Sequence, residues 1–244
     1  MYDRTLDGET LTFGHEGVLY RNSFVMYDHG SESLWVHVTG EAIKGPKKGS
    51  QLRFLPSVIV PWGFWRKEHP ETTVLLGEMV EGFMGAFSLQ NRLSSNGLSV
   101  GEGRNVTLFR YELLSQVPVL NTQVGEEPVV VTFAEEIVLG AAFSTQLGER
   151  QLHFDPILEL SKPSEASEPP SGASSGSGSE APKPIVSTMR DSETGSIWDI
   201  RNGRCLRGPL AGERLKPLTA TAWLGKRWVH FFPEGKVVGL PKAD

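Results

Sequence analysis

The chain has 244 residues, of which 39% are hydrophobic, and a formal net charge of −5. This length is enough for one large or two small domains with a buried core, and the lack of a basic excess argues against nucleic acid as a partner. The only cysteine, Cys205, excludes an internal disulfide and any cysteine-rich metal site. We interpret Cys205 as a small buried hydrophobe rather than a reactive thiol.

The N-terminal residues 1–13 show no basic segment followed by an apolar run, as a signal peptide would. No window approaches the ~20 apolar residues that a membrane helix needs. The sequence therefore predicts no membrane insertion. By default it predicts a cytoplasmic protein, unless a longer parent protein carries an export signal.

Taken in chain order, the hydrophobic pattern is mostly that of short strands separated by turns. Strands are expected at 10–13, 33–38, 73–76, 82–89, 151–154, 196–200 and 236–240, with hairpins over 98–111 and 117–133. Short helices are expected at 61–69, 111–116 and 220–228. The predicted fold class is mainly β, with a few short helices that close the ends of sheets.

One stretch of the sequence occurs twice. Residues 26–70 match residues 189–233 without a gap at an offset of 163, with 12 identities in 45 positions. Ordinary composition would give about 3 identities by chance. The identical residues are mostly Gly, Pro, Trp and Leu, which are structural types, and they include Trp35/Trp198 and Asp28/Asp191. We interpret the match as a tandem duplication of one β-sheet unit.

The second copy carries an insertion. Ahead of it, Leu11 and Phe13 align with Leu152 and Phe154 at an offset of only 141, so 22 residues have been added. Residues 161–184 contain no aromatic or large aliphatic side chain and are expected to form a disordered loop. The predicted organisation is a first repeat at 1–80, incomplete at its N-terminus, a connector at 81–91, and a second repeat at 92–244.

The chain resembles an uncharacterised prokaryotic family, the domain of unknown function 3179. The resemblance rests on residues 7–46, 65–75 and 117–133, and it is most specific over 28–49. It implies no established activity. Members of the family often carry a Cys-x-x-Cys pair after the strand that corresponds to 128–133, but residues 134–140 of this chain contain no cysteine.

The candidate catalytic residues are Asp28, Asp191 and His37. Each Asp precedes a turn-like segment, where it could accept backbone N–H bonds or act as a general base or metal ligand. No second carboxylate recurs in both copies. His37 shares a predicted strand face with Trp35, and its counterpart is Ile200, so we expect the His37 side chain to face inward.

Aromatic side chains provide the candidate ligand-binding residues, which are Trp35, Trp198, Trp62, Trp65 and Trp228. They could line an apolar cleft, although core packing is the commoner use of such residues. The six histidines show no metal-binding spacing, so neither a metal nor another cofactor is predicted.

Two functions remain open at this point. The favoured one is a non-enzymatic binding or scaffolding module with a small-ligand cleft at the junction of the repeats. The alternative is a hydrolase-like or metal-dependent enzyme that uses Asp28 or Asp191 with His37.

Overall fold

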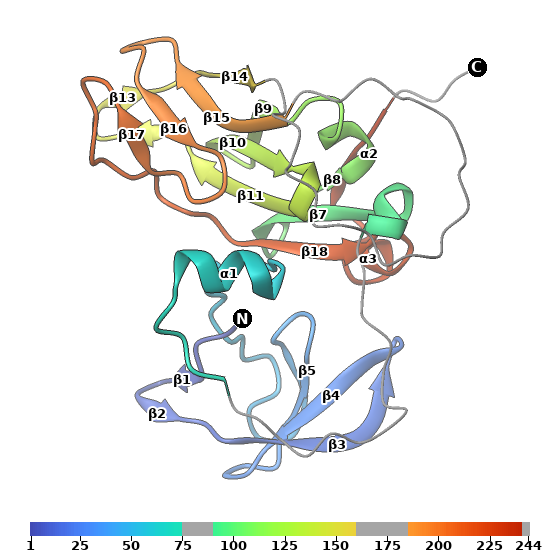
Figure 1. Ribbon diagram of the computed structural model, residues 1–244. Coiled ribbons are helices and arrows are strands. Elements are labelled where there is room, and N and C mark those ends of the chain that lie inside the picture. Colours follow the sequence, from blue (N-terminus) through green and yellow to red (C-terminus); the bar gives the residue numbers. More distant parts are fainter. Residues whose placement is uncertain (75–89, 160–184, 241–244) are drawn as a thin grey trace, which may run out of the picture.

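The computed structural model describes residues 1–74, 90–159 and 185–240. Within these ranges the protein is mainly β with three short α-helices, which confirms the predicted fold class (Figure 1). The strand expected at 82–89 and the insertion expected at 161–184 fall outside the described residues. No helix in the described ranges is long and apolar enough to cross a membrane.

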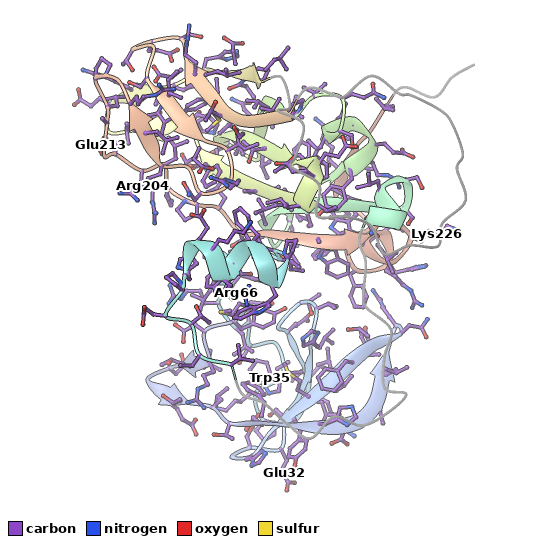
Figure 2. All side chains as sticks on the ribbon, viewed as in Figure 1. Glu32, Trp35, Arg66, Arg204, Glu213 and Lys226 are labelled. Atoms are coloured by element: carbon purple, nitrogen blue, oxygen red, sulfur yellow. The ribbon has the colours of Figure 1, made fainter. Side chains whose placement is uncertain are left out.

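The first unit is a two-stranded hairpin followed by a four-stranded antiparallel sheet in the order β3-β4-β5-β6. Its strands are β1 (Thr5–Leu6), β2 (Glu9–Thr10), β3 (Phe13–Tyr20), β4 (Ser23–Asp28), β5 (Leu34–Val36) and β6 (Ala42–Lys44). Trp35 points into the small core of this unit, whereas Glu32, in the turn before it, lies at the outer surface (Figure 2).

The second unit has the same hairpin and the same sheet order, β14-β15-β16-β17. Its strands are β12 (Gln146–Leu147), β13 (Arg150–Gln151), β14 (Phe154–Glu159), β15 (Ile185–Asp191), β16 (Ile197–Asp199) and β17 (Cys205–Arg207). Met26 lies opposite Trp35 across β4 and β5, as Met189 lies opposite Trp198 across β15 and β16. A shared origin of the two units is our interpretation of this correspondence.

Two further sheets complete the described structure. One has the order β18-β7-β8-β19, in which β19 runs parallel to β8, and its strands are β7 (Asn96–Glu102), β8 (Asn105–Arg110), β18 (Ala220–Leu224) and β19 (Lys236–Val238). The other has the order β11-β10-β9, with β9 (Val119–Val124), β10 (Glu127–Ala134) and β11 (Leu139–Ser144). The hairpins expected at 98–111 and 117–133 are therefore present.

Strand β10 is buried on both faces, which explains its continuous apolar run. Val130 and Ala134 belong to the core that the three-stranded sheet shares with the second unit. Val129, Val131 and Phe133 belong to the core between this sheet and the sheet of β7 and β8. Because successive side chains of β10 point to opposite faces, this one strand contributes to the cores on both of its sides and so links three layers of sheet.

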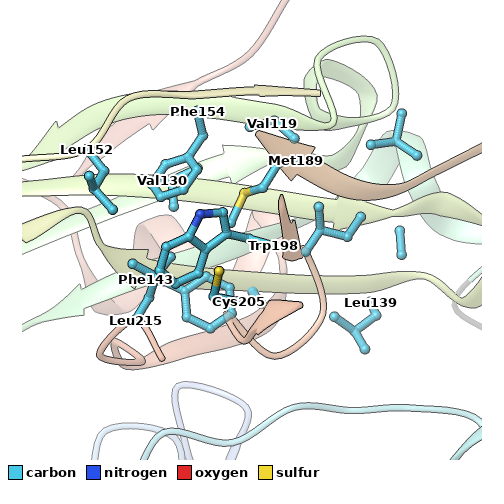
Figure 3. Close-up of a cluster of buried hydrophobic side chains, with 14 residues drawn as sticks. Val119, Val130, Leu139, Phe143, Leu152, Phe154, Met189, Trp198, Cys205 and Leu215 are labelled. Atoms are coloured by element: carbon cyan, nitrogen blue, oxygen red, sulfur yellow. The ribbon is translucent and has the colours of Figure 1, made fainter. Parts of the chain in front are cut away.

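Figure 3 shows the core of the second unit around Trp198. The edge of the Phe154 ring meets the Trp198 ring at a centroid distance of 5.8 Å, and Phe13 meets Trp35 in the same way at 5.7 Å. Cys205 is buried in this cluster, as its interpretation as a small hydrophobe requires.

The helices are α1 (Trp62–Glu68), α2 (Tyr111–Leu114) and α3 (Gly225–Phe231), with 3-10 turns at η1 (Gln90–Ser95) and η2 (Glu135–Ile137). The helices expected at 61–69 and 111–116 are present. The third expectation, a helix at 220–228, is wrong in its first half, because Ala220–Leu224 pairs with β7 as strand β18. A local pattern cannot reveal this pairing, since β7 lies more than 100 residues earlier in the chain.

Segment 57–68 connects the two units. Val60 packs against the core of the second unit, and the guanidinium of Arg201 lies 5.1 Å from the centroid of the Phe64 ring. Helix α1 accordingly lies between the first unit and the upper sheets in Figure 1. The first unit therefore packs on the rest of the molecule through this segment.

The close packing of the turns after β6 and β17 can be tested by substituting two glycines in each turn and comparing the losses in stability. Gly45 has φ +94° and a β-carbon there would lie 2.7 Å from the Cα of Ser33, whereas Gly49 has φ +88° and open space around it. We expect Gly49→Ala to cost about 1–2 kcal/mol for its left-handed backbone, and Gly45→Ala to cost about 1–3 kcal/mol more because of the clash. Denaturant unfolding measures the difference.

Gly208 and Gly212 provide the same comparison in the second unit, where a β-carbon at Gly208 would lie 2.7 Å from the Cα of Ser196. The Ala variants should show the same order. Equal losses for the two glycines of a pair would contradict the close packing of this turn.

Candidate functional site

Asp28, at the end of β4, organises the turn that leads into β5. Its Oδ1 accepts the backbone N–H of Ser31 at 2.6 Å, and its Oδ2 accepts the Ser31 hydroxyl at 2.7 Å and the indole N–H of Trp35 at 2.9 Å. The hydroxyl of Ser33 lies 2.7 Å from that of Ser31 and accepts the backbone N–H of Lys47 at 3.0 Å. Asp28 is fully buried, and each carboxylate oxygen has at least one donor.

The second unit repeats this network with Thr194 in place of Ser31 and Leu210 in place of Lys47. Asp191 accepts the backbone N–H of Thr194 at 2.6 Å and the indole N–H of Trp198 at 2.8 Å. The Thr194 hydroxyl takes the place of the Ser31 hydroxyl, and the Ser196 hydroxyl accepts the backbone N–H of Leu210 at 3.2 Å. Ser31 and Thr194 both supply a hydroxyl, but they are not identical residues. A comparison that counts only identities between the two units therefore does not reveal that this position is equivalent.

These bonds give Asp28 a structural role. Burial alone would raise the pKa of Asp28, but the hydrogen bonds from Trp35 and Ser31 outweigh it and lower the pKa below 3.8. The ionised carboxylate is therefore the form that the fold stabilises. With its acceptor sites filled by the turn and by Trp35, it has no surface on which a substrate could lie.

His37 does not lie where we expected. Strand β5 ends at Val36, and the His37 side chain is exposed rather than directed inward like its counterpart Ile200. The backbone N–H of His37 bonds to the carbonyl of Phe24, at the opposite end of β4 from Asp28. Four residues along a strand separate the two by about 13 Å, so they cannot act together on one bond.

The environment of His37 differs from that of Ile200 because different groups cover the two units. The Ile200 carbonyl accepts the hydroxyl of Thr132 on β10, whereas the His37 carbonyl accepts the hydroxyl of Tyr2. Desolvation by its surroundings, together with the positive charge of the Met1 amino group, lowers the pKa of His37 below 6.5.

The five candidate tryptophans fall into two groups. Trp35, Trp198 and Trp228 are fully buried, and their indole N–H groups bond to Asp28, Asp191 and Ser99 respectively. They are core residues and offer no surface to a ligand. Trp62 and Trp65 lie on α1, where Trp62 is 47% exposed and Trp65 donates its indole N–H to Thr72. Neither residue lines the cleft described next.

A cleft of about 470 Å³ lies between the first unit and the sheet of β7, β8 and β18. Val38, Thr39, Glu41, Gln51 and Phe54 line it from the first unit. Ser99, Glu102, Val106, Thr219 and Trp223 are among the residues that line the opposite side. This volume lies within the range of ordinary small-molecule sites.

The polar groups of the cleft set its chemistry. Two carboxylates, Glu41 and Glu102, line it, and among the described lining residues there is no Lys or Arg. Glu102 accepts the hydroxyl of Thr219, and Ser99 accepts the indole N–H of Trp228 at 2.7 Å. The Thr39 hydroxyl oxygen is buried and has no hydrogen-bond partner among the described residues.

An adjoining hollow of about 560 Å³ shares Val38, Phe54 and Trp223 with this cleft. His37 and Arg227 line it, so the basic groups lie on this side of Trp223 and the acidic groups lie on the other. Within the described ranges, no group of three or more His, Cys, Asp or Glu residues is arranged to hold a metal ion.

The fold and the cleft define a β-rich protein with two sheet units of the same strand order and a junction of ligand size. The family model described as "Protein of unknown function (DUF3179)" matches residues 1–91, which confirms the resemblance over that range. The chain has no significant match among curated proteins or solved structures. That residues 92–244 form a second copy stays a prediction.

The structural role of Asp28 predicts a stability series. Asp28→Ala leaves three buried donors unpaired, while Asp28→Asn keeps one acceptor oxygen, so stability at neutral pH should fall in the order wild type, Asn, Ala. Each bond to the charged group is worth about 1.5–3 kcal/mol. Because the folded pKa lies below the unfolded one, the advantage of wild type over Asn is complete above about pH 4 and is lost as the pH falls through the folded pKa.

Unfolding free energies at pH 7 and at pH 2 to 4 measure both effects. Asp191→Asn and Asp191→Ala form the matched pair at pH 7, where the same order is expected. An Asn variant that is more stable than wild type would show that the carboxylate serves function at the expense of stability.

Proposed function

We propose that this protein is a non-enzymatic binding module whose junction cleft holds a small organic cation. The observation that carries the proposal is the lining of the cleft, which combines two carboxylates with several aromatic side chains and, among the described residues, includes no Lys or Arg.

The charge of the cleft favours a cation. Glu41 and Glu102 place negative charge at its wall without a basic residue among the lining residues described above. An anion would therefore meet repulsion.

The aromatic side chains favour a cation of the ammonium type. Phe54, Trp223, Phe231 and Phe232 line the cleft, and the centroid of the Trp223 ring lies 5.6 Å from that of Phe232. The faces of such rings attract quaternary ammonium groups by about 0.5–2 kcal/mol each.

Choline is a suitable probe, because it combines a quaternary ammonium group with one hydroxyl. At a concentration of 100 Kd, a ligand specific to the folded state adds about 2.7 kcal/mol of stability. For a protein of this size, that corresponds to a rise in melting temperature of about 5–11 °C. We expect a saturable rise with choline and none with phosphate.

Two tryptophan variants provide the control for position. Trp223→Ala removes an aromatic wall of the cleft and should abolish the choline effect. Trp62→Ala removes an exposed tryptophan outside the cleft and should leave the effect intact. Equal responses of the two variants, or stabilisation by phosphate rather than choline, would refute the proposal.

A further inference from the structure

A second cavity, of about 300 Å³, lies on the side of β18 where segment 57–59 crosses it. Its inner wall is formed by core residues of the β7, β11 and β18 strands, among them Leu98 and Ala220. Met1, Ser57, Val58 and Ile59 form the opposite wall. The cavity shares only Thr221 with the lining of the junction cleft, and it shares Met1, Thr221 and Ala222 with the hollow that adjoins the cleft.

Tyr111 brings a polar group to this mostly apolar cavity, whose lining also includes the polar residues Ser57 and Thr221. It begins α2 directly after β8, is 1% exposed, and stacks on Phe133 at a centroid distance of 4.8 Å. Its backbone carbonyl accepts the Ser115 hydroxyl, but its own hydroxyl has no hydrogen-bond partner among the described residues. Buried tyrosines usually bond through this group. Burial also raises the pKa of Tyr111 well above its ordinary value, so at neutral pH the phenol keeps its proton and can donate it in a hydrogen bond.

Val138, in the same cavity wall, has a strained backbone. It ends the η2 turn with φ 50° and ψ 42°, in the left-handed region that a β-branched residue rarely adopts. Such strain persists only where the surrounding structure enforces it, and it is concentrated at ligand sites. Gly140 follows with no side chain, at a point where a β-carbon would lie 3.1 Å from Leu98. The backbone that follows β10 thus adopts an unfavourable conformation where it lines this cavity.

We propose that this cavity binds a small, mostly apolar molecule that carries one hydrogen-bond acceptor, and that the Tyr111 hydroxyl donates to that acceptor. The mostly aliphatic walls select an apolar body, and the unpaired phenol of Tyr111 selects one carbonyl or ether oxygen. A dry apolar cavity of about 150 Å³ already holds benzene. The volume here therefore has room for a ring with a polar substituent.

The test compares two probes of the same shape, cyclohexanone and methylenecyclohexane, of which only the ketone accepts a hydrogen bond. Dissociation constants come from ligand-observed NMR titration of the full chain. We expect cyclohexanone to bind wild type about five- to tenfold more tightly than methylenecyclohexane. Tyr111→Phe, which keeps the ring and its stacking, should remove that difference by weakening the ketone alone.

Two controls fix the interpretation. The ligand-free Tyr111→Phe protein should melt at the same temperature as wild type or higher, since the lost hydroxyl has no hydrogen-bond partner in the part of the chain that the structure describes. Ala222→Leu, which fills the cavity from β18, should abolish binding of both probes. The proposal fails if neither probe binds wild type, if both bind it equally, or if Tyr111→Phe leaves the preference for the ketone unchanged.

Discussion

The structure depends on the need to satisfy a carboxylate that is buried in each sheet unit. Asp28 and Asp191 are fully buried, where an unpaired charge would cost several kcal/mol. Each is therefore surrounded by a turn N–H, a hydroxyl and an indole N–H. These bonds hold Trp35 and Trp198 in one orientation at the centre of their cores. One polar constraint thus fixes the turn, the direction of the following strand and the main packing residue.

Different neighbours give the two equivalent sheets different roles. The second unit is covered by the three-stranded sheet, whose central strand β10 is buried on both faces, so its Trp198 belongs to a core of fourteen buried residues. The core of the first unit has four buried residues, and the unit contacts the rest of the molecule through segment 57–68 and the junction cleft. Burial contributes roughly in proportion to apolar area. Among the described residues, the core that the second unit shares with the three-stranded sheet therefore contributes more to stability than the core of the first unit, and the first unit forms one wall of the cleft.

The cavities arise where these layers meet rather than within a sheet. The junction cleft is acidic and aromatic, while the cavity at Tyr111 is mostly aliphatic. In the cavity at Tyr111 the informative group is the phenol, which has no hydrogen-bond partner among the described residues. Inside a medium of low polarity such a group discriminates strongly between ligands that can and cannot bond to it.

The sequence by itself determined the mainly β fold, the hairpins, the offset between the two units and the residues that fill their cores. These features are local or repeated, so periodicity, turn residues and self-comparison reveal them. Only the tertiary structure decided that Ala220–Leu224 is a strand, that His37 is exposed while Ile200 is buried, and that Trp65 is half-exposed while Trp228 is enclosed. Each of these outcomes depends on a partner that is distant in sequence, such as β7 for β18 or Thr132 for Ile200. The same holds for Thr39 and Tyr111, since a missing hydrogen bond is a property of the assembled surroundings and not of the residue.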